Sequence, residues 1–363
     1  MKRIPVTPRS DYREKIEVLG FDFHGDYWRE EAYYRFTNEA YRLYCEAAQF
    51  IIEDNPEFME RALNIPKEIG ERIRASWGAD ELSLYGRFDF ILAKDGTPKI
   101  LEFNADTPTS LLEASVIQWQ WKEDVFPECD QFNGIHEGLV QSWKDIFPKK
   151  GEIHFAGALE NNEDTGTLQY LASTAMEAGF STRVLDMQAL DLQNGRFFDP
   201  AGELVNRCFK LYPWEWMVDE SPDGCLAEME WLEPIWKLVM SNKAILATLY
   251  ELFPDSPYVL PCYLSRPRSG LFCKKPIFSR EGHNVSVVDI RDWEEYVRIA
   301  ETEGDYNTGA YVYQEYVEPT AYSGRYPVIG SWIIGGEAAG IGIRENRMEV
   351  TDNLSEFVPH IIG

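Results

Sequence analysis

Two alternating segments on either side of an Asp-Gly turn constrain the fold of this chain most strongly. Residues 85–93 read Tyr-Gly-Arg-Phe-Asp-Phe-Ile-Leu-Ala, with the aromatic content and the period of two that are typical of strands. Asp95 and Gly96 form a hairpin turn signal, and residues 98–103 are the expected return strand. The sequence therefore predicts a β-hairpin inside a chain of mixed α/β class.

Four polar side chains occupy matching positions on this hairpin. Arg87 and Asp89 are two residues apart, as are Glu102 and Asn104, and side chains two apart in a strand point to the same face. Two carboxylates and an amide oxygen suit Mg²⁺ that is shared with phosphate oxygens. A neighbouring guanidinium suits a carboxylate or a transferring phosphoryl group. The alternative is a solvated hairpin with an ordinary salt bridge, and the pattern alone leaves both open.

Three basic residues elsewhere are further candidates for phosphate contacts. Lys275 ends a predicted strand before a polar loop with Gly282, and Lys243 lies on a helix predicted for residues 235–253. Arg344 ends a Gly-Ile-Gly-Ile-Arg run, in which the glycines permit close backbone approach. Each has an ordinary alternative, namely a surface hairpin for Lys275, a solvated helix charge for Lys243 and a strand-end cap for Arg344.

The rest of the chain divides into four expected parts. Residues 28–78 have helical spacing, residues 152–187 are typical of a βαβ unit, and residues 235–318 mix a helix with strands. The loop inside the βαβ unit lacks GxGxxG, so a dinucleotide site there is not expected. The expected parts are a helical segment with the hairpin (1–150), a βαβ lobe (151–234), a lobe of helix and strands (235–318) and a return to the central sheet (319–363).

Charge and cysteine content limit the partners and the compartment. The formal net charge is −26, and so acidic a surface repels nucleic acid and attracts cations such as Mg²⁺ or an amine; the alternative is a solubilising surface. Six widely spaced cysteines form no CxxC pair, which favours reduced thiols over zinc. No apolar run reaches membrane-spanning length, and residues 1–10 lack a signal-peptide core. We expect a cytoplasmic protein that does not bind membranes; the oligomeric state stays open.

Ordered motifs then run along nearly the whole chain. They are GFDFH (20–24), SLYGRFD (83–89), LEFNADTPTS (101–110), KLYPWEWM (210–217), SNK (241–243), KPIFSREGHN (275–284), IGSW (329–332), GIR (342–344) and FVPH (357–360). By these motifs the chain resembles the synthetase domain of the glutathionylspermidine synthase family, including synthetase-only relatives described as acid–amine ligases. The bifunctional members carry an amidase domain first, whereas this chain starts at the synthetase, so no amidase is expected.

The resemblance implies an ATP-grasp-type fold of α/β (α+β) class, with ATP and Mg²⁺ as cofactors. Residues 152–187 would belong to a pre-ATP-grasp lobe, and residues 235–318 to a mobile ATP lid. The implied roles are metal ligands (Asp89, Glu102, Asn104), the acyl-phosphate contact (Arg87), phosphoryl transfer (Arg344), ATP binding (Lys243, Lys275, Gly282), the adenine pocket (Gln314, Glu315) and the substrate (Thr107, Thr109, Ser110, Glu113).

The implied function is an ATP-dependent carboxylate–amine ligase that acts through an acyl-phosphate, on a peptide-like acid and a polyamine or other amine. Two alternatives remain, a nucleotide-binding protein without catalysis and a kinase that stops at a phosphorylated product. The run 107–113 lacks the small, Ser-rich residues found there in glutathionylspermidine synthetases, which counts against glutathione itself. Glu160, Glu163 and Asp164 would steer a cationic amine, or form a merely solvated loop.

Overall fold

The protein is described here by a computed structural model that covers residues 28–280, 282–292, 296–304, 306, 309–322, 324–346 and 355–362. The GFDFH motif at 20–24 lies outside the described residues. A five-stranded antiparallel sheet forms the centre, in the order β17-β16-β15-β1-β2. Its strands are β1 (Tyr85–Leu92), β2 (Pro98–Asn104), β15 (Tyr326–Ile334), β16 (Glu337–Asn346) and β17 (Glu356–Val358). The predicted hairpin is confirmed, and β15 and β16 form a second hairpin across Gly335 and Gly336.

Strand β1 has a period of two, although all of its residues are buried. On one face Phe88 and Phe90 pack against aromatic rings of a long helix, with centroids 5.1 Å apart for Tyr44 and Phe88 and 4.6 Å apart for Phe36 and Phe90. Arg87 and Asp89 alternate with them and therefore point to the other face. A central strand with a neighbouring strand on each side can bury both of its faces. In β1 one of these buried faces carries the charged side chains Arg87 and Asp89.

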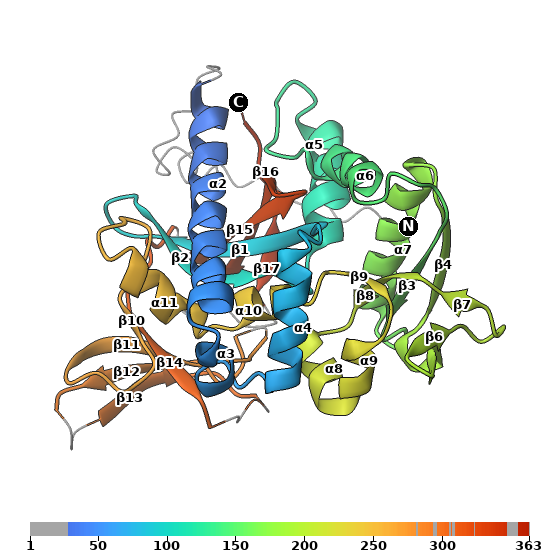
Figure 1. Ribbon diagram of the computed structural model, residues 1–363. Coiled ribbons are helices and arrows are strands. Elements are labelled where there is room, and N and C mark those ends of the chain that lie inside the picture. The colour runs from blue at the N-terminus through green and yellow to red at the C-terminus, as the bar shows by residue number, and fades with distance from the viewer. Residues whose placement is uncertain are drawn as a thin grey trace.

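Helices cover both faces of the central sheet. Helix α2 crosses one face, where Thr37 Oγ1 lies 2.9 Å from Ser331 Oγ of β15 (Figure 1). On the opposite side α6 approaches β15 so closely that a Cβ on Gly138 would lie 3.2 Å from Ile334. The helical elements from residue 28 to residue 146 are α2 (Trp28–Gln49), η1 (Phe50–Asp54), α3 (Glu57–Arg61), α4 (Lys67–Gly78), η2 (Glu113–Ile117), α5 (Gln118–Val125) and α6 (Ile135–Ile146).

A four-stranded parallel sheet lies on one side of the central sheet, in the order β4-β3-β8-β9. It contains the predicted βαβ unit, β3 (Glu152–Gly157), α7 (Asn162–Glu177) and β4 (Ser181–Asp186). Its other strands, β8 (Arg207–Leu211) and β9 (Glu230–Leu232), are short and were not expected. The connections hold η3 (Met187–Ala189), β5 (Asp191–Gln193), β6 (Arg196–Phe198), β7 (Leu204–Val205), α8 (Trp214–Glu220) and α9 (Pro222–Leu226).

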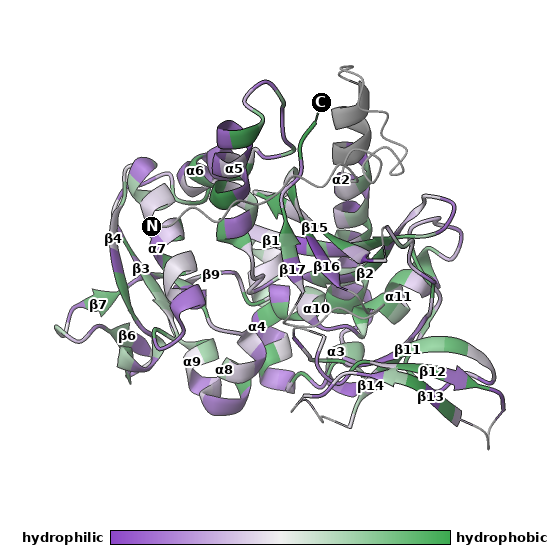
Figure 2. Ribbon diagram, turned by 180° about the vertical axis from the view of Figure 1, so that it is seen from behind, coloured by the Kyte–Doolittle hydropathy of each residue, from purple (hydrophilic) through white to green (hydrophobic). Residues whose placement is uncertain are grey.

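A second antiparallel sheet lies on the other side, and the view from behind in Figure 2 shows the same placement. Its order is β10-β14-β11-β12-β13. The strands are β10 (Cys262–Tyr263), β11 (Gly270–Pro276), β12 (Ser286–Ile290), β13 (Tyr296–Glu301) and β14 (Tyr311–Glu315). We call it the distal sheet. None of the helices in the described ranges combines the length and apolar character that crossing a membrane requires.

The single helix predicted for residues 235–253 is wrong. The structure has α10 (Lys237–Ser241) and α11 (Ile245–Leu252), with a break at residues 242–244. The Asn242 side chain accepts the Ala244 N–H at 2.9 Å and donates to Leu63 O at 3.0 Å. The Lys243 N–H donates to Ile277 O, in the segment directly after β11, at 2.9 Å. Tertiary partners therefore replace helical hydrogen bonds, and Lys243 lies in the break instead of on a helix.

Candidate active site

The hairpin β1–β2 brings its four polar side chains together. Arg87 lies opposite Asn104 in the register, and Asp89 lies opposite Glu102. All four line one cleft with an empty volume of about 1170 Å³, open solvent included. The convergence predicted from the Asp-Gly hairpin is thus present. The alternative of a solvated hairpin does not hold, because Arg87 is 4% exposed and Asp89 is 5% exposed.

Asp89 is held by two arginines. Arg87 binds it in a bidentate manner through one edge of its guanidinium, with Nε 2.7 Å from Oδ1 and Nη2 3.1 Å from Oδ2. Arg344 reaches across from β16 and places Nη2 2.7 Å from Oδ2. Burial alone would lower the pKa of Arg87, but the charge and hydrogen bonds of Asp89 and the charge of Glu102 together raise it. Arg87 also donates to Thr109 O, which ties the strand to the next loop.

Glu102 is held by lysines from the distal side. Lys243 Nζ lies 3.0 Å from Glu102 Oε2 and 2.6 Å from Ser279 O. Burial opposes ionisation of Glu102, yet the fields of Lys243 and Lys275 outweigh it and lower its pKa to about 2. Asn104 Nδ2 is 3.4 Å from Glu102 Oε1. Lys243 and Lys275 are each 6% exposed, which excludes a solvated helix charge and a surface hairpin.

Lys275 and Gln314 join the distal sheet to the central sheet. Lys275 Nζ donates to Gln314 Oε1 at 2.8 Å and to Leu101 O at 3.2 Å. Gln314 Nε2 donates to Ile100 O at 2.9 Å. Both polar ends of the Gln314 side chain are therefore engaged, so this residue fixes Lys275 instead of offering a free amide to the cleft.

The cleft contains most of the predicted site residues and an apolar wall. Besides the hairpin residues its lining includes Lys243, Lys275, Gly282, Gln314, Glu315, Arg344, Thr107 and Thr109. Ser110 and Glu113 do not line it, and Ser110 has a left-handed backbone at φ 66°. The apolar wall is made by Ile91, Leu101, Leu260, Val285, Val317 and Val328. A cleft lined by both cations and apolar side chains fits a nucleotide, which carries charged phosphates and an apolar base.

A second cavity adjoins the cleft. Its empty volume is about 870 Å³, and it shares Thr107, Thr109 and Arg280 with the cleft. Its far wall includes Glu163 and Asp164 at the start of α7. The loop of residues 105–110, which follows β2, therefore forms the boundary between the two cavities.

Arg280 was not among the predicted site residues. Its Nη2 lies 2.8 Å from Glu215 Oε1, and its Nη1 donates to Thr107 Oγ1. Burial would lower the pKa of Arg280, but the charges of Glu215 and Asp106 raise it. The sequence feature that could have identified Arg280 is the KPIFSREGHN motif, in which it is the sixth residue.

The donor set limits how a metal ion would bind. Within the described ranges no three acidic, histidine or cysteine side chains gather in a way that would hold a metal ion. An ion in the cleft would depend on Asp89 and Glu102, the Asn104 amide oxygen and oxygens of a ligand. That mixture suits Mg²⁺, which usually takes one or two carboxylates together with substrate phosphates.

Comparison with known proteins then identifies the family. The family model for the glutathionylspermidine synthase preATP-grasp domain matches residues 3–363. The chain belongs to the glutathionylspermidine synthase family. The family resemblance inferred from the ordered motifs is therefore confirmed.

Curated relatives of this family member differ in length. A Haemophilus influenzae protein named "Putative acid–amine ligase" is 34% identical, with 99% of each chain covered. The trypanothione synthetase of Crithidia fasciculata is 28% identical over 89% of this chain and 53% of its own. The bifunctional glutathionylspermidine synthetase/amidase of Escherichia coli is 26% identical over 92% of this chain and 58% of its own. The chain thus spans little more than half of these two longer relatives.

A solved structure supports the fold. The structure of a glutathione synthetase-like effector from Globodera pallida, in its apo form, matches with a TM-score of 0.56 at 10% identity. The match covers 97% of this chain and 88% of that chain. The mixed α/β architecture with several sheets is therefore shared with a glutathione synthetase-like protein.

Proposed function

We propose that this protein is an ATP- and Mg²⁺-dependent ligase that joins a carboxylate to an amine through an acyl-phosphate. The observation that carries the proposal is the cleft itself, in which five buried or half-buried cations and an apolar wall accompany the two carboxylates Asp89 and Glu102. Membership of the glutathionylspermidine synthase family supports it. The names of the relatives support a peptide-like acid and a polyamine or another amine as substrates.

Asp89, Glu102 and Asn104 hold the magnesium ion in this proposal. In the cleft both carboxylates are bound by cations, Asp89 by two arginines and Glu102 by Lys243. Nucleotide phosphates draw these cations away and leave the carboxylate oxygens to the metal. When bound, the ion neutralises charge on the phosphate oxygens during transfer.

Lys243 and Lys275 bind the phosphates of ATP, and the apolar wall receives the base. Gly282 allows close approach of the backbone to the phosphates, since its φ is 69°. Gln314 acts by holding Lys275, while the backbone of Gln314 and Glu315 faces the base. The chain divides into residues 1–150, a pre-ATP-grasp lobe (151–234), a mobile lid lobe (235–318) that includes the distal sheet, and a return to the central sheet (319–363).

The chemistry takes two displacements. An oxygen of the acid attacks the γ-phosphorus, the bond from that phosphorus to its bridging oxygen breaks, and ADP leaves. The amine nitrogen attacks the carbonyl carbon of the acyl-phosphate, inorganic phosphate leaves, and the nitrogen loses a proton. Arg87 and Arg344 stabilise the charge that develops on the transferred group, because preformed cations in a buried site cost little reorganisation.

The second cavity receives the substrates. Thr107 and Thr109 offer hydroxyl groups on the side that faces the cleft, and Ser110 and Glu113 follow in the same segment. Glu163 and Asp164 attract the cationic amine from the far wall. The six cysteines are free thiols, which fits the reducing cytoplasm as the compartment.

ADP release over a panel of acids and amines tests the function, with mass detection of the amide. We expect ADP only when acid and amine are both present, and a loss of at least a hundredfold in Asp89→Ala and Glu102→Ala. Glu318→Ala, which removes an exposed carboxylate beside the hairpin turn, is the matched control. Unchanged rates in both cleft variants would overturn the metal assignment. ATP binding without ADP from any mixture would favour a non-catalytic binding protein.

A further inference from the structure

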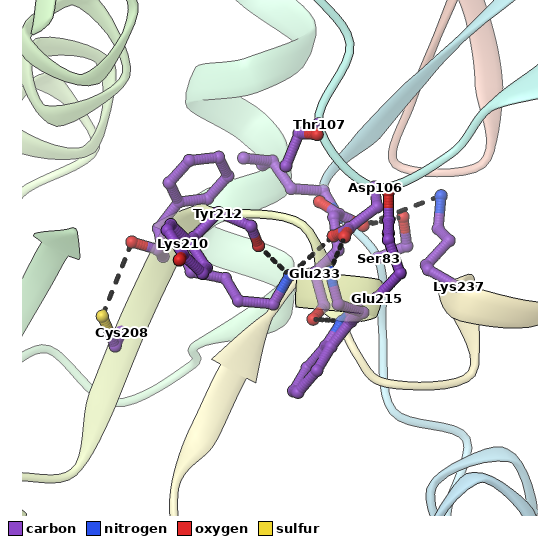
Figure 3. Close-up of polar contacts among 12 residues, drawn as sticks. Ser83, Asp106, Thr107, Cys208, Lys210, Tyr212, Glu215, Glu233 and Lys237 are labelled. Carbon is purple, nitrogen blue, oxygen red and sulfur yellow. Dashed lines mark hydrogen bonds and ion pairs between the residues drawn. The ribbon is translucent and has the colours of Figure 1, made fainter. Parts of the chain in front are cut away.

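A layer of buried charge lies beneath the loop that separates the two cavities (Figure 3). Asp106, two residues after Asn104, is 1% exposed and contacts Lys210 of β8, which is fully buried. Lys210 Nζ lies 2.8 Å from Asp106 Oδ1 and also donates to Tyr212 O at 2.9 Å. Asp106 Oδ2 accepts the backbone N–H of Trp214 at 2.7 Å. The loop that follows β2 is thereby joined to the parallel sheet.

This loop is held at three points. Asp106 fixes it from below, Thr107 receives Arg280, and Thr109 O receives Arg87. The first contact comes from the parallel sheet, the second from the segment after β11, and the third from β1. The two threonines line both cavities, whereas Asp106 and Lys210 line neither. The buried pair therefore acts through the loop and makes no contact of its own with either cavity.

A gain in folding stability does not by itself explain the buried ion pair of Asp106 and Lys210. Two charges taken out of water lose much of their hydration, and apolar replacements of buried pairs are often as stable. Burial raises the pKa of Asp106 and lowers that of Lys210, while their mutual attraction opposes both changes. The pair instead fixes the orientation of the Asp106 side chain, because its carboxylate accepts hydrogen bonds from donors on β8 and α8 at the same time.

We propose that Asp106 and Lys210 are a positioning pair that sets the loop 105–110 at the boundary between the nucleotide cleft and the second cavity. Thr107 and Thr109 are thereby kept where a group in the second cavity meets the transferred phosphoryl group. The inference rests on the proposed ligase function and adds residues that contact neither nucleotide nor substrate. Loss of the pair weakens the use of the second cavity and leaves nucleotide binding intact.

The test uses the double variant Asp106→Asn/Lys210→Met, which removes both charges together. Removing only one partner leaves an unpaired charge in the interior, whereas removing both avoids it. Arg207→Gln/Glu230→Gln is the matched control, because it removes a partly exposed ion pair that joins the same strand β8 to its neighbour β9. If this double variant does not fold, Asp106→Asn/Lys210→Gln serves instead, because it also removes both charges and keeps polar groups for the Trp214 N–H and Tyr212 O.

Two measurements are made on the full chain. Amide hydrogen exchange of peptides covering residues 104–112 should rise at least tenfold, while peptides of β3 and α7 stay within twofold. With ATP, glutathione and spermidine as probes, the KM for glutathione or spermidine should rise at least tenfold, and the KM for ATP should stay within twofold. A pair with a merely structural role would raise exchange throughout the chain and would not separate the KM values.

The outcomes are separable. Unchanged hydrogen exchange in residues 104–112 of a folded double variant overturns the positioning role. The same conclusion follows if the KM for ATP rises as much as the KM for glutathione or spermidine. A wild-type chain that releases no ADP with these probes contradicts the choice of substrates under the proposed function. In that case hydrogen exchange, which needs no substrate, still decides the positioning role.

Discussion

At the scale of single residues, the charged side chains of the cleft form ion pairs with one another. Each carboxylate that is proposed to bind metal has a basic partner within 3.0 Å, Asp89 in Arg87 and Arg344 and Glu102 in Lys243. A metal ion that arrives alone must displace these cations and leave them unpaired in a buried site, which is costly. Phosphates that bind together with the metal form ion pairs with these displaced cations. Metal and nucleotide should therefore bind cooperatively.

Lys243→Met tests this exchange directly. Without Lys243 the Glu102 carboxylate loses its nearest cation, so we expect Mn²⁺, used as a probe for Mg²⁺, to bind the nucleotide-free variant at least tenfold more tightly than the wild type. The affinity for a non-hydrolysable ATP analogue should fall at least tenfold. Titration calorimetry measures both. Lys94→Met, an exposed lysine at the hairpin turn, is the control, and equal metal affinity in Lys243→Met and wild type would refute the exchange.

Glu233 gives a prediction about pH. It is fully buried, and Glu233 Oε1 accepts the N–H groups of Leu84 and Tyr85 at 3.1 Å each. Burial raises its pKa to about 7, although Lys237 partly opposes this. The native state therefore holds a proton that the unfolded chain has released above pH 4.5, so native stability falls as pH rises from about 5 to 7.

Glu233→Gln removes that titration and can still accept both N–H groups. We expect the free energy of unfolding in urea to decline less between pH 5 and pH 7 than in the wild type, by an amount on the order of 2 kcal/mol. Lys237 keeps its bond to Tyr85 O at 3.1 Å in the variant. A variant whose stability falls as steeply as that of the wild type would assign the titration to another group.

At the scale of elements, the hairpin β1–β2 was predictable because its signals are local. Alternation, aromatic content and the Asp-Gly turn all lie within twenty residues, and together they set which side chains share a face. The βαβ unit was predictable for the same reason. The four cleft side chains of the hairpin followed from its register alone, without any distant contact.

Other elements depend on distant partners and were missed. The break between α10 and α11 is made by Asn242 and Lys243, whose bonds go to Leu63 and Ile277. The short strands β8 and β9 carry few residues each and pair only within the parallel sheet. The roles of Asp106 and Lys210 required the two residues, 104 positions apart, to be seen in contact. No periodicity in the sequence encodes such a pairing.

Gly330 of β15 gives a prediction at this scale. It lies opposite Asp89, and a Cβ there would come within 2.8 Å of Arg87 Cδ and 3.3 Å of Gly342 O. Gly330→Ala should displace the Arg87 guanidinium from Asp89 and lower ADP release at least tenfold, with the melting temperature reduced by only a few degrees. Gly78→Ala, where a Cβ meets nothing within 4 Å, is the control. Normal ADP release in Gly330→Ala would show that Arg87 tolerates the added methyl group.

At the scale of the whole molecule, the cleft contrasts with the chain that surrounds it. The chain has 35 basic and 61 acidic residues and a formal charge of −26. In the cleft the four predicted cations outnumber the two predicted metal carboxylates, and they come from the central sheet, the break before α11 and the distal sheet. The cleft is therefore a local site for anions in an acidic protein, assembled only when these parts of the fold meet.

The acidic excess itself predicts how salt affects stability. Like charges repel more strongly in the compact native state than in the expanded unfolded chain, and the screening length falls from about 30 Å at 0.01 M salt to about 8 Å at 0.15 M. We expect the melting temperature at pH 7.5 to rise by several degrees when NaCl is raised from 10 to 150 mM. Calorimetry at pH 5, where many carboxylates begin to take up protons, is the control and should show a smaller rise. A melting temperature that falls with added salt at pH 7.5 would mean that the buried ion pairs around Asp89, Glu102 and Asp106 outweigh the surface repulsion, and that the −26 charge is spread too widely to strain the fold.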